Sequence, residues 1–96
     1  MVYLKEDLKN AYVTYAKEIA LTISNSLLDF AKKNPGRTEY DETIYIHRQI
    51  ADEILIALQD KFADSEVTMS FQADLDPHYE IPTLHGMAKF VINWSD

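Results

Sequence analysis

The sequence predicts an α+β domain in which an antiparallel helical hairpin is followed by a two-stranded antiparallel β-hairpin, in the order α-α-β-β. Two periodicities predict this fold. Up to residue 62, apolar residues recur every three or four positions, which is the period of a helix with one buried face. After residue 65, apolar and polar residues alternate, which is the period of a half-buried strand. With 96 residues, the chain is expected to form a single domain, 1–96.

The first predicted helix runs from about Leu4 to Lys33. Residues 34–36, Asn-Pro-Gly, end it, because proline disfavours helical backbone at the preceding residue and glycine suits a C-terminal cap. Weak helix formers at 22–26 allow a bend in the middle of this helix. The apolar stripe consists of Leu8, Tyr12, Ala16, Ile19, Ile23, Leu27 and Phe30.

The second predicted helix follows a polar connector at 37–42 and runs from Asp41 or Thr43 to Phe62. Because the loop between the two helices is short, we expect them to pack as an antiparallel pair. The apolar stripe of the second helix consists of Ile44, His47, Ile50, Ala51, Ile54, Leu58 and Phe62.

Two predicted strands complete the chain, one at about 66–74 and one at about 84–94, joined by a loop with two prolines. The first strand places Val67, Met69, Phe71 and Ala73 on one face. The second places Leu84, Gly86, Ala88, Phe90, Ile92 and Trp94 on one face.

The predicted elements do not cover one another, which favours self-association. A straight first helix of about 30 residues is roughly 45 Å long and would overhang its neighbours by about 15 Å. A two-stranded sheet is marginal and has two open edges. We therefore expect a homodimer that joins two hairpins or pairs two long helices, although a monomer with a bent first helix remains an alternative. The residues expected to mediate self-association are Leu8, Tyr12, Ile23, Leu27, Met87 and Val91.

The composition is globular, with 47% apolar and 26% charged residues, and it excludes several classes of function. The net charge of −7 argues against direct binding to nucleic acid. The absence of cysteine excludes thiolate chemistry and favours a reducing compartment, so we expect a cytoplasmic protein. No apolar run reaches the roughly 20 residues of a membrane span, and no signal peptide is expected at the start of the sequence.

Acidic residues concentrate in the second half of the chain, where residues 38–96 contain twelve acidic and three basic side chains. Such a surface attracts basic patches on other proteins. We therefore expect a small interaction protein that binds or inhibits a larger protein, in one version a phage or mobile-element accessory factor acting on a nucleic-acid-binding enzyme. The expected contact residues are Asp52, Glu53, Asp60, Asp76, His78, Tyr79, Glu80 and His85.

Three alternatives to this hypothesis stay open. An oligomer could hold a small molecule at subunit junctions lined by Tyr12, Tyr15, Tyr79 and His85. A divalent cation would suit Asp74, Asp76, His78 and Glu80, with His85 or Asp64, but Pro77 interrupts their extended spacing, and we expect no metal and no other cofactor. An enzyme using His47 or His78 as an acid-base ranks last, because no nucleophile motif or phosphate-binding loop accompanies them, and we expect no catalysis.

Overall fold

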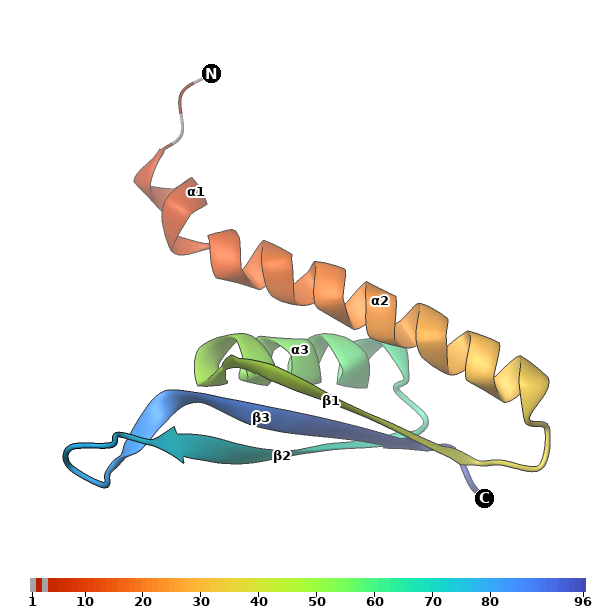
Figure 1. Ribbon diagram of the computed structural model, residues 1–96. Helices are drawn as coiled ribbons and strands as arrows, with labels where there is room; N and C mark the ends of the chain where they lie inside the picture. Colours follow the sequence, from red (N-terminus) through yellow and green to blue (C-terminus); the bar gives the residue numbers. More distant parts are fainter. Residues whose placement is uncertain (1, 3) are drawn as a thin grey trace.

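The protein consists of two long helices over one face of a three-stranded antiparallel sheet (Figure 1). This description comes from a computed structural model that describes residue 2 and residues 4–96. The α+β class is confirmed, whereas the expected α-α-β-β order and a sheet of only two strands are wrong, because the sheet has three strands and one of them precedes the second long helix. The elements are α1 (Lys5–Lys9), α2 (Ala11–Lys33), β1 (Glu39–His47), α3 (Arg48–Lys61), β2 (Glu66–Leu75) and β3 (Pro82–Asn93).

The strand that the sequence analysis missed is β1, which occupies the expected connector and the expected start of the second helix. It pairs with β3 over nine residues, from Glu39 opposite Asn93 to His47 opposite His85. Its even-numbered residues, 40 to 46, face the helices, and its odd-numbered residues, 39 to 45, are exposed. Thr-Ile-Tyr-Ile at 43–46 is rich in β-branched and aromatic residues, which fit a pleated, half-buried surface. The helix therefore begins at Arg48 instead of at Asp41 or Thr43.

The segments β2 and β3 pair antiparallel as predicted, and the predicted faces are those observed except at Leu84, which is exposed. Val67, Ala88, Phe90 and Ile92 are buried beneath the helices. The sheet order is β1-β3-β2, so the last strand of the sequence lies between the other two. Because β1, α3 and β2 follow one another and β3 is inserted between the two strands, this part of the chain is a split β-α-β unit.

The predicted first helix is divided at Asn10 and is continuous through 22–26, where a bend was allowed. The Ser24 hydroxyl donates to the Ala20 carbonyl at 2.7 Å, and the Thr22 hydroxyl donates to the Glu18 carbonyl at 3.1 Å. These polar side chains are satisfied within the helix, so they do not compete with it. Among the described elements, α1 contacts only α2, and it projects beyond the rest of the fold (Figure 1).

The core lies between α2, α3 and the inner face of the sheet. Small residues on the helices, Ala16, Ala20 and Ala51, are fully buried and let α2 approach α3 closely. Each larger side chain in this core stabilises the fold by about 1.5–3 kcal/mol relative to exposure. The buried apolar residues are Ala16, Ala20, Ile23, Leu27, Ile46, Ala51, Ile54, Leu58, Val67, Ala88, Phe90 and Ile92.

Candidate functional site

The end of the β2–β3 hairpin, residues 74–85, extends beyond the edge of the remaining fold (Figure 1). We call this segment the hairpin end. The pairing of β1 with β3 stops at His85, so residues 82–84 of β3 pair only with β2 or with nothing. Asp74 and His85 contact β1 at the base of the hairpin end. Residues 75–84 pair with no residue of β1, and most of them are exposed.

Asp76 organises the loop at the hairpin end. Its carboxylate oxygen Oδ1 accepts hydrogen bonds from the backbone N–H groups of His78, at 2.8 Å, and Tyr79, at 3.1 Å. The Asp76 backbone also bonds to Ile81 and Glu80, each at 2.8 Å. Glu80 adopts a left-handed backbone conformation with a φ of 54°. The loop is thus ordered by its own contacts, and the predicted contact residue Asp76 has a role in shaping it.

Large apolar side chains gather at the hairpin end and remain exposed. Leu75, Tyr79, Ile81 and Leu84 lie within ten residues of sequence, and their exposed fractions range from 57% to 75%. A cluster of exposed apolar residues on a single chain is typical of an interaction site. Only Tyr79 among these four was predicted as a contact residue, because Leu84 was assigned to the apolar face of a strand and 75–82 was interpreted as a loop with two prolines. Apolar residues flanking the two prolines were the signal that could have indicated them.

An aromatic cluster lies beside the hairpin end on the open face of the sheet. The Tyr45 hydroxyl, from β1, donates to Asp74 Oδ2 in β2 at 2.5 Å and so reaches across β3. The His85 ring stacks with Tyr45 at 6.3 Å between centroids and meets His47 edge-on at 4.9 Å. The hydrogen bond to the Asp74 carboxylate raises the pKa of Tyr45. His85, predicted as a contact residue, therefore lies at the base of the hairpin end among aromatic rings.

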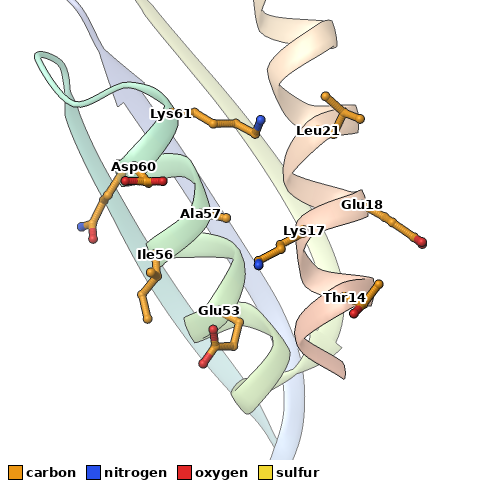
Figure 2. Close-up of a pocket in the computed structure, with 10 residues that line it drawn as sticks. Thr14, Lys17, Glu18, Leu21, Glu53, Ile56, Ala57, Asp60 and Lys61 are labelled. Carbon is orange, nitrogen blue, oxygen red and sulfur yellow. The ribbon is translucent and has the colours of Figure 1, made fainter. Parts of the chain in front are cut away.

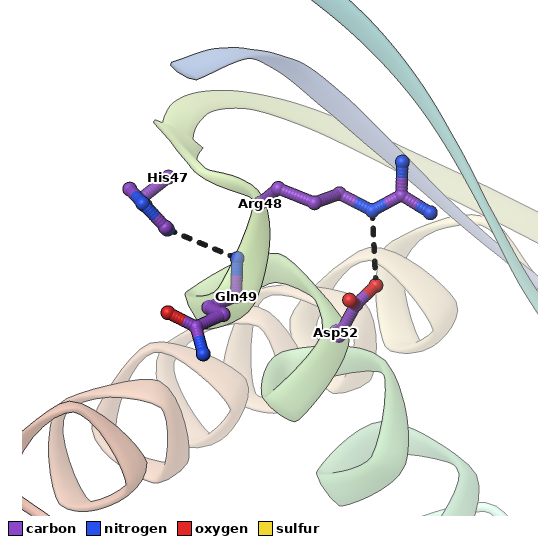
Figure 3. A network of polar contacts seen from close by, with 4 residues as sticks. All are labelled: His47, Arg48, Gln49 and Asp52. Carbon is purple, nitrogen blue, oxygen red and sulfur yellow. Dashed lines mark hydrogen bonds and ion pairs between the residues drawn. The ribbon is translucent and has the colours of Figure 1, made fainter. Parts of the chain in front are cut away.

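His47 acts as the N-cap of α3. Its Nδ1 atom accepts a hydrogen bond from the Gln49 backbone N–H at 3.0 Å, as Figure 3 shows. An imidazole nitrogen that accepts a backbone hydrogen bond has a structural role, so this geometry favours a cap over an acid-base catalyst. Next to it, Arg48 Nε pairs with Asp52 Oδ1 at 3.2 Å, and the Arg48 guanidinium lies over the Phe71 ring at 5.1 Å.

The acidic residues predicted on α3 lie on a different surface from the loop. Glu53 and Asp60 line a groove of about 800 Å³ between α2 and α3, shown in Figure 2. Leu21 and Ile56, each about half exposed, supply its apolar lining, and Lys17 extends between the helices. None of the hairpin-end residues lines this groove, so the predicted contact set divides into two surfaces.

The residues predicted for self-association also lie in different parts of the fold, some buried in the core and some exposed. Ile23 and Leu27 are 0% and 4% exposed in the core of a single chain, so they are not available to a second chain, contrary to expectation. The first predicted helix overhangs its neighbours at its N-terminal end, where Leu8 on α1 is 69% exposed. Tyr12 is half-buried on α2, and Met87 and Val91 lie on the open face of β3.

Two alternative sites drawn from the sequence are not assembled within one chain. Among the residues that the structure describes, no three histidine, aspartate or glutamate side chains are placed to hold a metal ion. Asp74 and Asp76 instead bind Tyr45 and the loop backbone. Tyr12 and Tyr15 belong to α2, whereas Tyr79 belongs to the hairpin end.

Comparisons of the chain with protein-family models, curated proteins and solved structures find no match. Within the described part of the chain, every helix is too short or too polar to cross a membrane.

Proposed function

We propose that the chain is a small, non-catalytic interaction protein that binds a larger protein by placing its hairpin end in a cleft of that partner. The observation that carries this proposal is the exposure of Leu75, Tyr79, Ile81 and Leu84 on a loop that is already ordered. Binding by an ordered loop costs little conformational entropy, and exposed tyrosine is enriched among residues that dominate binding energy.

The charge around the hairpin end indicates the chemistry of the partner. Asp74, Asp76 and Glu80 lie in the same segment of the chain as the exposed apolar residues, and the chain carries a net charge of −7. The complementary surface is an apolar cleft with a basic rim, because opposite charges speed the encounter and fix its orientation. Nucleic-acid-binding enzymes have basic clefts of this kind, so inhibition of such an enzyme is one form of the proposal.

The proposal includes self-association, which the free edges of the sheet support. Both outer strands, β1 and β2, have one side that pairs with no strand among the described residues. An open edge is a template for pairing with another chain. A dimer would present two hairpin ends and would raise the avidity for a partner that has two sites.

Photocrosslinking followed by binding measurements tests the proposed partner site. p-Benzoylphenylalanine is placed at residue 79 in one variant and at residue 15, on α2, in a matched control. The partner captured at residue 79 is then purified and its dissociation constant is measured by calorimetry. We expect Tyr79→Ala to weaken binding about tenfold or more, and Tyr15→Ala to leave it nearly unchanged.

Tyr15 is a suitable control because it is also an exposed tyrosine, at 51%, but belongs to a different surface. If Tyr79→Ala and Leu84→Ala both bind the purified partner as tightly as the unmodified chain does, the hairpin end is not the binding site. Crosslinking at residue 15 but not at residue 79 would contradict the proposal in the same way.

A second candidate function, binding of a small molecule, is favoured by the groove between α2 and α3. Its volume of about 800 Å³ lies within the range of ligand sites, and Leu21 and Ile56 give it an apolar lining. The tyrosines expected to line such a site are not part of it. A thermal-shift screen of nucleotides and metabolites tests this candidate: a rise in melting temperature that Ile56→Asp abolishes would support it, whereas no rise would remove it.

A further inference from the structure

The two free edges of the sheet differ in their ability to pair with a second copy of the chain. The β1 edge is a nine-residue strand without proline or lysine, and its pairing with β3 is uninterrupted. The β2 edge has an irregularity between Ala73 and Leu75. Because β2 also lacks proline and lysine, the irregularity is the difference between the two edges. A bulge disrupts the pairing of an edge strand, so β1 is the less protected edge.

We propose that two copies of the chain pair antiparallel through β1, about a two-fold axis at Thr43, to form a continuous six-stranded sheet. This inference depends on the self-association part of the proposed function and is independent of the hairpin-end partner. The axis is perpendicular to the sheet, so the helices of both copies cover the same face and the open faces form one surface.

Full-length pairing of β1 selects this register, and the charge pattern of the strand is compatible with it. Pairing all nine residues about Thr43 places Glu39 opposite His47 and Asp41 opposite Tyr45 of the second copy. Glu42 then lies opposite Ile44, so no carboxylate faces another carboxylate. Unlike or neutral cross-strand pairs stabilise a sheet, and the central Thr43 pair is itself a favourable combination.

Other registers and the other edge are less favourable. An axis at Asp41 or at Glu42 would place that carboxylate directly opposite its own copy, and like charges in this position are destabilising. Pairing β2 with itself about Ser70 would place Glu66 opposite Asp74. Pairing about Ser70 therefore places two carboxylates opposite each other in β2, whereas pairing about Thr43 places none opposite each other in β1, which makes β1 the more compatible edge.

The absence of cysteine makes a direct test of the register simple. Thr43→Cys places one thiol at the proposed two-fold axis, where opposing Cα atoms lie about 4.5–5.5 Å apart, within the range that a disulfide spans. Ser70→Cys is the matched control, because Thr43 and Ser70 are both opposite Lys89 on the same face of the sheet. Under mild oxidation we expect a covalent dimer from Thr43→Cys and not from Ser70→Cys.

Sedimentation equilibrium of cysteine-free variants gives the second measurement. Thr43→Lys should lower the association constant about fivefold by placing two lysines opposite each other, and Ser70→Lys should not lower it. A dimer whose Thr43→Cys variant does not crosslink, or crosslinks no better than Ser70→Cys, overturns the β1 pairing and leaves self-association intact. A monomer at all concentrations overturns both, without affecting the test of the hairpin end.

Discussion

At the scale of single residues, side chains of the same type have different structural roles, which the sequence pattern alone does not distinguish. Tyr40 is one of six tyrosines. It packs against Phe30 with ring centroids 5.3 Å apart, and its hydroxyl donates to Glu42 Oε1 at 2.6 Å. Burial of the hydroxyl and its bond to the Glu42 carboxylate raise the pKa of Tyr40 to about 12. Tyr40 therefore joins the end of α2 to the start of β1 in its protonated form.

Ionisation of Tyr40 should weaken the fold at alkaline pH. A phenol with a pKa near 10 in the unfolded chain and about 12 in the folded chain favours folding below pH 10, and this contribution is lost as the pH rises to 12. Urea unfolding should show that the wild-type chain loses more stability than Tyr40→Phe between pH 10 and 12. Tyr79→Phe, which removes an exposed phenol, serves as the control. An equal loss of stability in the wild-type chain and in Tyr40→Phe would contradict the stabilising role of the Tyr40 phenol.

At the scale of elements, the close approach of β2 to β3 explains one of the two glycines. A Cβ atom on Gly86 would lie 2.1 Å from the Gln72 carbonyl oxygen and 2.7 Å from the Ala73 Cα atom. Both are backbone atoms, which cannot move away by a change of rotamer as a flexible side chain can. The glycine therefore permits the two strands to pair next to the irregularity between Ala73 and Leu75.

Substitution of the two glycines should separate this effect from the general cost of losing a glycine. Gly86→Ala should reduce the free energy of unfolding by at least the roughly 1–3 kcal/mol typical of overpacking. Gly36→Ala should change it by less than about 0.5 kcal/mol, because no atom lies within 4 Å of the added Cβ. Urea unfolding measures the free energy of unfolding of both variants. If Gly86→Ala were as stable as Gly36→Ala, the strands could move apart to accommodate the added methyl group, and the prediction would be wrong.

The elements whose burial follows one clear period were predictable from the sequence. The stripe of α2 and the alternation in β2 and β3 have a single interpretation each. The segment 39–47 does not, because Ile44 and His47 continue the helical spacing of α3 while Tyr40, Ile44 and Ile46 alternate with polar residues. Its pairing with β3 decides between the two, and that contact joins residues that lie from 38 positions (His47 and His85) to 54 positions (Glu39 and Asn93) apart in the sequence. Local pattern alone could not supply it.

The candidate site was predictable in part for the same reason. The loop residues Asp76, His78, Tyr79 and Glu80 were found because they lie between two strands that the pattern identified. The contact of Tyr45 with Asp74 could not be found, since it spans the full width of the sheet and requires the strand order. Ile23 and Leu27 were assigned to a partner because the predicted helix was longer than the elements thought to cover it, yet they are buried against α3 and the sheet.

At the scale of the whole molecule, β3 holds the other parts together. It pairs with both β1 and β2 and supplies Ala88, Phe90 and Ile92 to the core. The Trp94 backbone N–H also donates to the Thr38 carbonyl at 2.9 Å, which extends the contact with β1 beyond the strand. In contrast, α1 contacts α2 alone among the described elements.

Deletion of the two ends should therefore have opposite consequences. A chain that lacks residues 82–96 should lose its cooperative thermal transition, because β1 and β2 then have no strand to pair with. A chain that lacks residues 1–9 should retain a transition close to that of the full chain. Circular dichroism at increasing temperature measures both, and a cooperative transition after removal of 82–96 would contradict the central role of β3.

The place of β3 in the sheet also affects how the protein is made. The strand that completes the sheet follows the other two in the chain, so β1 and β2 leave the ribosome before β3 is available to pair with them. During that interval their apolar faces have no permanent cover, and such faces promote aggregation of nascent chains. Parallel, in-register contact between two nascent β1 segments would place each of Glu39, Asp41 and Glu42 opposite its own copy, and this repulsion would oppose such aggregation.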